Sequence, residues 1–208
     1  MKIKLKYWDN FYKKKKLTLK PSKFAVFCKK YLINYKGIVY DIGCGNGRDS
    51  IYFNKNKIQC YGIDKSKEAI KKNKKNFTAY KKTFFNGNFC KNFLKNKNNE
   101  KFSIYSRFTL HAINYKEEDQ LISLLKKKNK LDFIFIECRT LKDEFYGIGR
   151  KVGKHEFISS HYRRFIDPKV LKNKLKKNFK IIYFKQSYNF AKFKKENPCI
   201  LRIIAKKK

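Results

Sequence analysis

The sequence predicts a doubly wound α/β fold, and two observations lead to this prediction. Short apolar runs rich in β-branched and aromatic residues alternate with segments of helical spacing, as in βαβ units. A glycine-rich turn follows the first of these runs and opens a helix, which is where such sheets bind ligands. The expected sheet has seven strands and is mostly parallel, and its last two strands are close enough in sequence to form an antiparallel hairpin.

The individual strands and helices follow from the period of the apolar residues along the chain. The expected strands are 37–42, 59–64, 84–89, 102–108, 131–137, 180–188 and 199–205. The expected helices are 21–32, a short helix that ends at 53, 67–75, 115–128 and 167–177. Prolines at positions 21 and 168 stand where two of these helices begin, which the fixed φ of proline allows. A basic, Asn-rich loop is expected at 91–101.

Length and composition predict one domain, residues 1–208, because no linker or internal repeat divides the chain. Residues 1–36 are expected to form N-terminal cap helices, and residues 140–166 a lid over the substrate. No stretch has the apolar length of an export signal or a membrane span, so we expect a cytoplasmic protein. The six cysteines lack metal-ligand spacing, which indicates buried thiols in a reducing compartment and no bound metal.

The charge of the chain is strongly positive, with 54 basic residues against 16 acidic ones. Such a balance is typical of proteins that bind nucleic acid or another polyanion. Nearly all of the basic residues are lysines, however. An A/T-rich coding background would also produce a high lysine content on solvated surfaces. Nucleic acid is therefore a possible partner that we do not favour. Where lysine is the default, an arginine or a carboxylate is the more informative residue.

The clearest motif is the glycine-rich turn Asp41-Ile42-Gly43-Cys44-Gly45-Asn46-Gly47-Arg48. Glycines allow the backbone to turn sharply and to approach a ligand closely, and the helix that follows offers free N–H groups. A dinucleotide fingerprint would need its third glycine at position 48, where this chain has Arg48. The motif therefore disfavours a nicotinamide dinucleotide.

With Asp64 at the end of the next strand, this turn resembles motifs I and II of class I S-adenosylmethionine-dependent methyltransferases. The resemblance implies that Asp64 binds both ribose hydroxyls of the cofactor and that Asp41 orients its methionine ammonium, directly or through water. It also implies that the glycine-rich turn lies along the amino-acid part of the cofactor. The contacts would come from Gly43, Cys44, Gly45 and Gly47. A glycine-rich turn of another α/β protein, with Asp64 capping a loop, is the alternative.

The resemblance extends over nearly the whole chain and suggests further cofactor residues. The segment Tyr7-Trp8-Asp9-Asn10-Phe11-Tyr12 is similar to the N-terminal part of small-molecule methyltransferases of the tellurite-resistance and thiopurine type, where an aromatic cap covers the cofactor. Trp8 is expected to do this, and burial against the core is the equal alternative. Asn88 stands where the family has an aspartate for the adenine amino group, and a plain loop residue is the alternative. The expected set is completed by Arg48, Lys65, Phe89 and Ser106.

The segment after strand 102–108 is the expected site of the methyl acceptor. Methyl transfer is a displacement at a sulfonium, so the enzyme must align a nucleophile and, for an alcohol, remove its proton. His111 is the candidate base, with Arg107 orienting an anionic group and Tyr162 assisting. A histidine after a strand is, alternatively, a hydrogen-bonded structural residue.

Four of the seven arginines are expected to converge on the acceptor site: Arg107, Arg139, Arg163 and Arg164. The planar guanidinium suits phosphate or carboxylate, so we expect a small anionic acceptor. Tyr146 and His161 complete the expected substrate site. Alternatively, the arginines pair with Glu137, Asp143 or Glu144 and fasten the insert.

The insert and the segment His161-Tyr162-Arg163-Arg164-Phe165 also resemble methyltransferases associated with surface-glycan biosynthesis, including proteins proposed to methylate phosphoramidate or sugar groups. This resemblance implies O-methylation of a phosphoryl-, phosphoramidate- or sugar-containing surface-glycan precursor. The competing functions are an RNA methyltransferase and a non-catalytic protein that binds polyanions. The sequence lacks the Asn/Asp-Pro-Pro-Tyr type of motif used in amino-group methylation of nucleic acids.

Overall fold

The computed structural model describes residues 2–15, 17–90, 100–192 and 196–208. The chain divides into two compact units, Met1–Tyr105 (unit 1) and Ser106–Lys208 (unit 2). Most of the loop expected at 91–101 lies outside the described residues. The expectation of one domain over 1–208 stays a prediction.

Unit 1 begins with two helices in the region where N-terminal helices are expected, and then alternates strand and helix. Its elements are α1 (Lys2–Lys14), α2 (Lys23–Lys29), β1 (Ile38–Ile42), α3 (Arg48–Lys55), β2 (Cys60–Asp64), α4 (Lys67–Asn76), η1 (Thr78–Thr83), β3 (Phe84–Asn86) and β4 (Phe102–Arg107).

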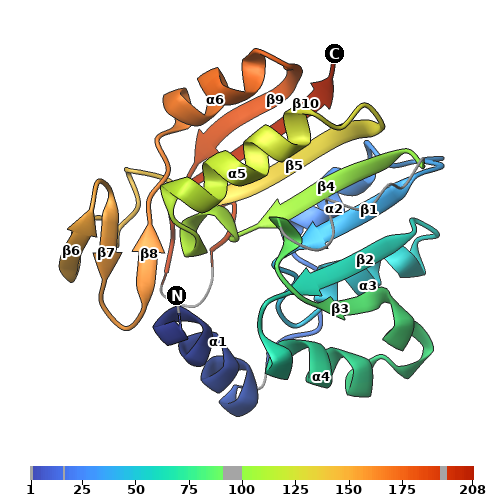
Figure 1. Ribbon diagram of the computed structural model, residues 1–208, viewed down its shortest axis with the longest axis horizontal. Helices are drawn as coiled ribbons and strands as arrows, with labels where there is room; N and C mark the ends of the chain where they lie inside the picture. Colours follow the sequence, from blue (N-terminus) through green and yellow to red (C-terminus); the bar gives the residue numbers. More distant parts are fainter. Residues whose placement is uncertain (1, 16, 91–99, 193–195) are drawn as a thin grey trace. The chain divides into compact units, whose positions relative to one another are not determined.

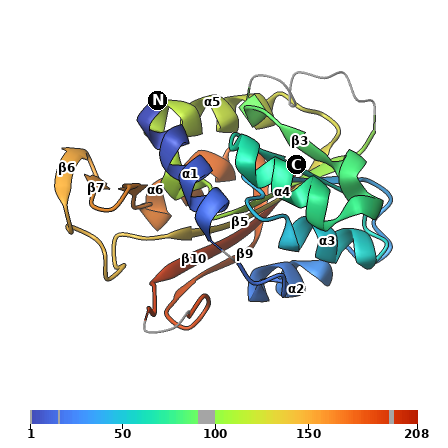
Figure 2. The same cartoon turned by 90° about the horizontal axis from the view of Figure 1, so that it is seen from below.

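Strand β1 is the centre of unit 1, and all five of its residues are buried. It pairs in parallel with β2 on one side and with β4 on the other, and β3 pairs in parallel with β2. Helices α2 and α3 pack against each other, and α1 packs against α4 (Figure 2). Ser22 and Ser66 begin α2 and α4 as N-caps, each accepting a backbone N–H three residues later.

Unit 2 contains the C-terminal strands and the insert. Its elements are η3 (Leu110–Ala112), α5 (Tyr115–Lys126), β5 (Leu131–Arg139), β6 (Arg150–Gly153), β7 (Glu156–Ile158), β8 (Tyr162–Arg164), α6 (Pro168–Lys176), β9 (Phe179–Ser187) and β10 (Ile200–Lys207). Strand β10 pairs antiparallel with both β5 and β9, which confirms the predicted C-terminal hairpin. Helix α6 lies along β9 (Figure 1).

The insert at 140–166 folds into a separate antiparallel sheet of three short strands, in the order β6-β7-β8. This sheet extends away from the end of β5 within unit 2 (Figure 1). The sequence gives no hint of it, because strands of three or four residues are too short to show a period.

Strand β4 belongs to both units, because residues 102–105 pair with β1 and the strand continues into unit 2 at Ser106. Just after β4, the N–H of Phe108 donates to the carbonyl of Glu137 in β5 at 2.8 Å. The strand order is β3-β2-β1-β4-β5-β10-β9. This order confirms the predicted fold, a mostly parallel sheet of seven strands with an antiparallel hairpin at its end. None of the helices within the described residues has the length and apolarity to span a membrane.

Candidate active site

The glycine turn of unit 1 lies between β1 and α3, as predicted. Gly45 and Gly47 have φ values of 52° and 71°, a left-handed conformation that other residues adopt only with strain. The turn is held against β2 because the N–H groups of Gly43 and Cys44 both donate to the carbonyl of Ile63. Gly47 is also the N-cap of α3, so the helix begins directly at the turn. The backbone of this turn is therefore set where a ligand can approach it closely.

The carboxylate of Asp64 lies against the same turn. It accepts hydrogen bonds from the N–H of Gly45 at 2.9 Å and from the N–H of Ser66 at 2.8 Å. Burial raises the pKa of Asp64, and these two N–H groups act in the opposite direction. The two halves of the predicted cofactor motif, which are separated by strand β2 and helix α3, thus meet in space.

Asp41, at the end of β1, is buried, and its Oδ2 accepts a hydrogen bond from the hydroxyl of Ser50 at 2.6 Å. Ser50 lies in the first turn of α3, so this bond ties the end of β1 to the helix after the glycine turn. Cys44 is buried, and burial raises the pKa of its thiol well above the usual range, with further increases from Asp41 and Asp64. Cys44 is therefore a neutral packing residue of the turn.

The remaining cofactor candidates of unit 1 lie on different elements. Nε of Arg48, at the start of α3, is 3.9 Å from Oδ1 of Asp49, and Nζ of Lys65 is 6.0 Å from the centre of the Phe89 ring. Trp8 lies on α1 and stacks on the ring of Tyr12. Oδ1 of Asn88 accepts the N–H of Cys90 at 2.9 Å, a bond typical of a loop residue.

Two residues at the glycine turn were missed by the sequence analysis. The amide of Asn73 in α4 donates to the carbonyl of Gly45 at 2.8 Å, and the hydroxyl of Tyr12 in α1 lies over Gly45. No local pattern marks either residue as functional, because each reaches the turn only when its helix docks. The aromatic composition of the segment around Trp8 was the one signal available.

In unit 2, the segment from Ser106 to His111 holds two unsatisfied polar atoms. The hydroxyl of Ser106 and Nδ1 of His111 are buried and have no hydrogen-bond partner among the described residues. Phe108, between them, has a φ of 59°, and such strained backbone at a non-glycine residue tends to mark functional sites. Native structures leave few buried polar atoms unpaired, so this segment is a candidate binding site.

The surroundings of His111 are cationic. Burial lowers the pKa of His111 well below its usual value, and Arg139, His161, Arg163 and Arg107 lower it further. The pKa of His161 is lowered to about 4, first by burial and then by Arg163 and Arg139. Both imidazoles are therefore neutral at pH 7.

These lowered pKa values predict a pH-dependent stability. An imidazole whose folded pKa lies below its unfolded value of about 6.5 stabilises the fold above that pH, and this contribution is lost as the pH falls. We expect the free energy of unfolding to fall between about pH 6.5 and pH 4, by at most about 1.4 kcal/mol per pH unit for each histidine. Urea unfolding of the wild type and of His111→Gln/His161→Gln across this range measures it. An identical slope in both proteins would contradict the prediction.

Three of the four arginines expected at the acceptor site come together. Arg107 and Arg139 both lie on the Phe108 ring, with their Cζ atoms 4.3 and 6.0 Å from its centre. Arg139 and Arg163 both lie 5.1 Å from the centre of the Phe145 ring. We call Arg107, Arg139 and Arg163 the arginine cluster.

The arginine cluster also has acidic partners, as predicted by the alternative interpretation in which the arginines fasten the insert. Arg107 binds Glu137 at 2.9 Å, and Arg139 binds Asp143 at 2.9 Å and Glu196 at 2.7 Å. The ion pair of Arg107 joins β4 to β5, and those of Arg139 fasten the insert and the C-terminal hairpin to β5. The side chain of Arg163 has a more exposed contact, donating to the hydroxyl of Ser159 at 2.8 Å.

Arg164 does not join this cluster, which corrects the expected convergence of four arginines. Its side chain is buried, where it pairs with Glu118 and donates to the carbonyls of Leu110 and Ile113. Consecutive residues of a strand point to opposite faces, so Arg163 and Arg164 cannot both face the same site. Arg164 is therefore a structural residue of unit 2.

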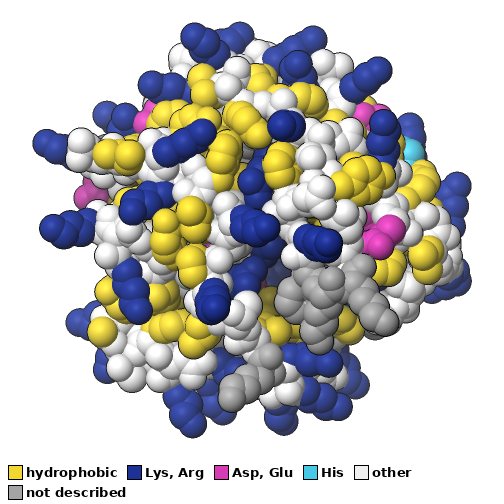
Figure 3. Space-filling view, turned by 180° about the vertical axis from the view of Figure 1, so that it is seen from behind, with side chains coloured by type: hydrophobic (Ala, Val, Ile, Leu, Met, Phe, Trp, Pro, Cys, Tyr) yellow, Lys and Arg dark blue, Asp and Glu magenta, His cyan; other side chains and the backbone are white. Residues whose placement is uncertain are grey.

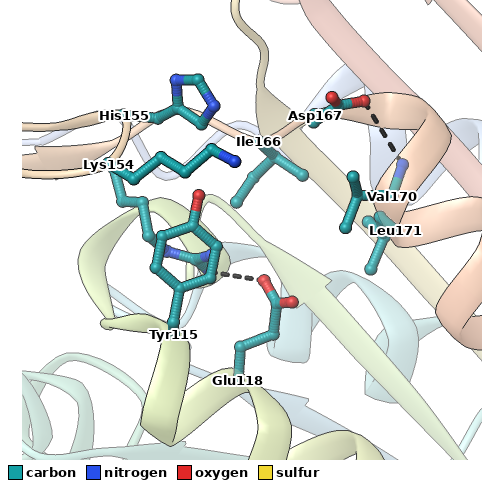
Figure 4. Close-up of a pocket in the computed structure, with 9 residues that line it drawn as sticks. Tyr115, Glu118, Lys154, His155, Ile166, Asp167, Val170 and Leu171 are labelled. Atoms are coloured by element: carbon teal, nitrogen blue, oxygen red, sulfur yellow. Dashed lines mark hydrogen bonds and ion pairs between the residues drawn. The ribbon is translucent and has the colours of Figure 1, made fainter.

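Arg164 lines a different cavity, of about 110 Å³. Figure 4 shows the labelled lining residues of this cavity, which come from α5, the β6–β7 turn and the start of α6. Its acidic groups are already paired. Glu118 binds Arg164 and Lys174, and Asp167 caps the first N–H groups of α6. These contacts explain the charged lining by the packing of α5 and α6, so we assign no ligand to this cavity.

Tyr146 and Tyr162, two further predicted substrate residues, lie in or beside the small sheet of the insert. The hydroxyl of Tyr146 binds Nδ1 of His155 at 2.8 Å, and its ring packs on Phe157 and Phe165. Tyr162 is buried, and burial together with Glu156 raises the pKa of its hydroxyl far above the usual value. Tyr162 therefore keeps its proton and can act only as a neutral hydrogen-bonding group.

Comparisons with known proteins agree with the geometry of unit 1. Residues 39–130 match the family model described as a methyltransferase domain, and this range holds the glycine turn, Asp64 and the segment from Ser106 to His111. This part of the chain is therefore similar to a methyltransferase domain. No curated protein matches the sequence.

Solved structures share the fold at low sequence identity. A SAM-dependent methyltransferase from Methanosarcina mazei has a TM-score of 0.67 at 16% identity and covers 86% of this chain and 96% of its own. The glycopeptide N-methyltransferase MtfA, complexed with S-adenosylhomocysteine, has a TM-score of 0.65 at 11% identity, with 91% and 90% covered. Magnesium protoporphyrin IX methyltransferase from Synechocystis, with bound SAM, has a TM-score of 0.60 at 14% identity, with 88% and 78% covered.

Proposed function

We propose that the enzyme methylates a small anionic acceptor and that this acceptor binds beside His111. The observation that carries the proposal is Nδ1 of His111, which is buried in cationic surroundings and has no partner within residues 2–15, 17–90, 100–192 and 196–208. A buried polar atom without a partner costs about 1–3 kcal/mol, and nearby positive charges favour an anion. A ligand that brings both a hydrogen bond and a negative charge would satisfy this site.

The residues of unit 1 fit S-adenosylmethionine, which when bound supplies an electrophilic methyl group. Two carboxylate oxygens suit the two ribose hydroxyls, so Asp64 would hold the ribose beside the glycine turn. Asp41, which Ser50 fixes at the end of β1, would bind the methionine ammonium. The left-handed glycines keep side chains away from the path of the amino-acid part.

His111 and the arginine cluster divide the work on the acceptor. Neutral His111 accepts a hydrogen bond at Nδ1 and takes the proton of an acceptor hydroxyl as the methyl group is transferred. An acceptor oxygen that is already anionic has no proton to lose, and the arginines then hold and orient it. In both cases the arginine cluster favours an acceptor that carries negative charge.

For the acceptor itself we propose a phosphoryl-, phosphoramidate- or sugar-containing precursor of a surface glycan. The support is the gathering of Arg107, Arg139 and Arg163 around Phe108 and Phe145, together with the resemblance of the insert. Three guanidinium groups near two aromatic rings suit a compact anion attached to a flat or ring-shaped group.

RNA methylation and non-catalytic polyanion binding are the competing functions, and the charge of the chain is their support. Figure 3 shows lysine and arginine side chains spread over the whole visible face, with apolar side chains between them. This spread favours a lysine-rich coding background over one selected surface. A salt titration of RNA binding separates the functions, because affinity based on phosphate contacts falls steeply with salt.

Turnover of variants tests the acceptor site. We expect His111→Gln to lower kcat by about 100-fold on a hydroxyl acceptor, since general base catalysis contributes about that much or more. We expect Arg163→Ala to raise KM about tenfold, equivalent to one charged hydrogen bond. Transfer of labelled methyl groups to a panel of phosphorylated sugars measures both.

The matched control is Arg150→Ala, because Arg150 is an exposed arginine of the same insert. It should leave both constants unchanged. Unaltered turnover in His111→Gln and in Arg163→Ala would remove this acceptor site.

We further propose that the enzyme works in the cytoplasm. All six cysteines are buried and free, which suits a reducing compartment.

A further inference from the structure

We infer that the carboxylate of Glu196 occupies the place of the acceptor's anionic group on Arg139, and that a phosphoryl group displaces it when the acceptor binds. This inference rests on the proposed function, in which an anionic acceptor binds beside His111. It narrows the acceptor to a molecule that carries a phosphoryl group, and it makes Glu196 a specificity-determining residue of unit 2.

Arg139 has two carboxylate partners that differ in burial. Its Nη1 donates to both oxygens of Asp143, at 2.9 and 3.1 Å, and the side chain of Asp143 has no exposed surface. Asp143 also accepts the N–H of Phe145 at 3.0 Å, which fixes it in the insert. Nη2 of Arg139 donates to Glu196 at 2.7 Å, and the side chain of Glu196 is 44% exposed. Glu196 is therefore the partner of Arg139 that a ligand can reach and replace.

The backbone beside Glu196 is held without the help of its side chain. The N–H of Asn197 donates to Oε1 of Glu144 at 3.1 Å. The side chain of Asn197 also forms two hydrogen bonds with Asn189, at 2.8 and 3.1 Å. The carboxylate of Glu196 can thus leave Arg139 while the chain stays in place. Because exposed ion pairs contribute little to stability, this displacement costs little free energy.

The place that Glu196 holds belongs to the arginine cluster and is close to His111. The guanidinium groups of Arg139 and Arg163 both lie 5.1 Å from the centre of the Phe145 ring. The centre of the Phe108 ring is 6.0 Å from Cζ of Arg139 and 5.1 Å from the centre of the His111 ring. An anion on Nη2 of Arg139 therefore has a second guanidinium and an imidazole in its surroundings.

The exchange of one anion for another selects ligands by their charge. A ligand carboxylate would replace the Glu196 carboxylate with an equal charge and equivalent hydrogen bonds, so it gains little. A phosphoryl group carries a charge of about −1.5 to −2 at pH 7 and has three acceptor oxygens, enough for more than one guanidinium. A neutral hydroxyl has no charge with which to displace Glu196. This contact therefore admits a phosphorylated acceptor and disfavours neutral or weakly charged ones.

Binding of inorganic phosphate tests this exchange without any turnover. The chain has three histidines, so ¹³C-labelled imidazoles give three NMR signals. The signals of His111 and His161 report on the arginine cluster, because Arg139 acts on the pKa values of both. His155 lines the separate cavity of Figure 4 and is the internal reference.

Two charge-removing variants are compared with the wild type. Glu196→Gln keeps the shape of the side chain and removes its charge. Glu144→Gln is the matched control, because Glu144 is a carboxylate of the insert whose hydrogen bond is to the N–H of Asn197, and the glutamine oxygen can still accept this bond. Unperturbed imidazole signals before phosphate is added check that each variant is folded.

We expect Glu196→Gln to bind phosphate about tenfold more tightly than the wild type, because the competing charge is gone. A merely structural role of Glu196 would not raise the affinity. Glu144→Gln should stay within about twofold of the wild type. The wild type should bind phosphate about tenfold more tightly than acetate at the same pH and salt, because acetate has only the charge of the group that it must displace.

Three results would overturn the inference. Equal affinity of Glu196→Gln and the wild type for phosphate would mean that Glu196 does not hold the anion's place. An equal gain in Glu144→Gln would reduce the effect to overall charge, and equal affinity of the wild type for acetate and phosphate would remove the selection for a phosphoryl group. If phosphate shifted neither His111 nor His161 in any of these proteins, the proposed anionic acceptor site itself would fail. That outcome is distinct, because the other three require that phosphate binds.

Discussion

Asp64→Asn will weaken binding of S-adenosylmethionine by about 100-fold, roughly 2.7 kcal/mol, while the protein stays folded. The asparagine has the same shape but only one oxygen, so it loses a charged acceptor for the ribose hydroxyls. Its amino group must also face the N–H of Gly45 or of Ser66, which now donate to the carboxylate. Two donors then oppose each other at the glycine turn. Calorimetric titration of the cofactor measures the loss, with a thermal melt to check folding.

Asp119→Asn is the control for this experiment, because the side chain of Asp119 is 61% exposed and pairs with Lys174 in unit 2. Its affinity for the cofactor should equal that of the wild type. Wild-type affinity in Asp64→Asn would mean that this carboxylate does not touch the ribose.

Glu137→Ala will lower the free energy of unfolding by about 3–5 kcal/mol. Glu137 is 1% exposed and bridges two arginines, at 2.9 Å to Nε of Arg107 and at 2.7 Å to Nε of Arg202. Burial raises the pKa of Glu137, and the two arginines act against this rise. Removing the carboxylate takes from two guanidinium groups the negative charge that they share. Urea unfolding at pH 7 measures the change.

Glu196→Ala is the control, since Glu196 also pairs with an arginine but has a side chain that is 44% exposed. Exposed ion pairs contribute about 0–1 kcal/mol, so this variant should be nearly as stable as the wild type. If Glu137→Ala lowered the free energy of unfolding no more than Glu196→Ala, the bridge between Arg107 and Arg202 would not stabilise the fold.

Much of unit 1 follows from local sequence. The strand predicted at 37–42 is found at 38–42, because its four apolar or aromatic residues and one aspartate are all buried. The turn at 43–47 follows from its glycines, whose left-handed φ values few other residues adopt. The helix at 67–76 follows from Ser66, whose side chain accepts an N–H in its first turn. Each of these signals acts within a few residues.

The contacts of the arginines could not be predicted from the local sequence. Sequence distance suggests that Arg163 and Arg164 act together, but strand geometry sends one toward Phe145 and the other toward Glu118. The sequence also does not mark which carboxylate pairs with which arginine. Arg139, for instance, binds both Asp143, four residues away, and Glu196, in the distant hairpin.

By itself, therefore, the sequence determined the fold class and the pairing of the glycine turn with Asp64, because period, turn chemistry and helix capping are local properties. Only the tertiary structure decided that Tyr12 and Asn73 reach the turn and that Nδ1 of His111 has no hydrogen-bond partner in the described part of the chain. Contacts of this kind depend on how separate elements dock. Docking is set by the shape and burial of whole faces, which no short stretch of residues encodes.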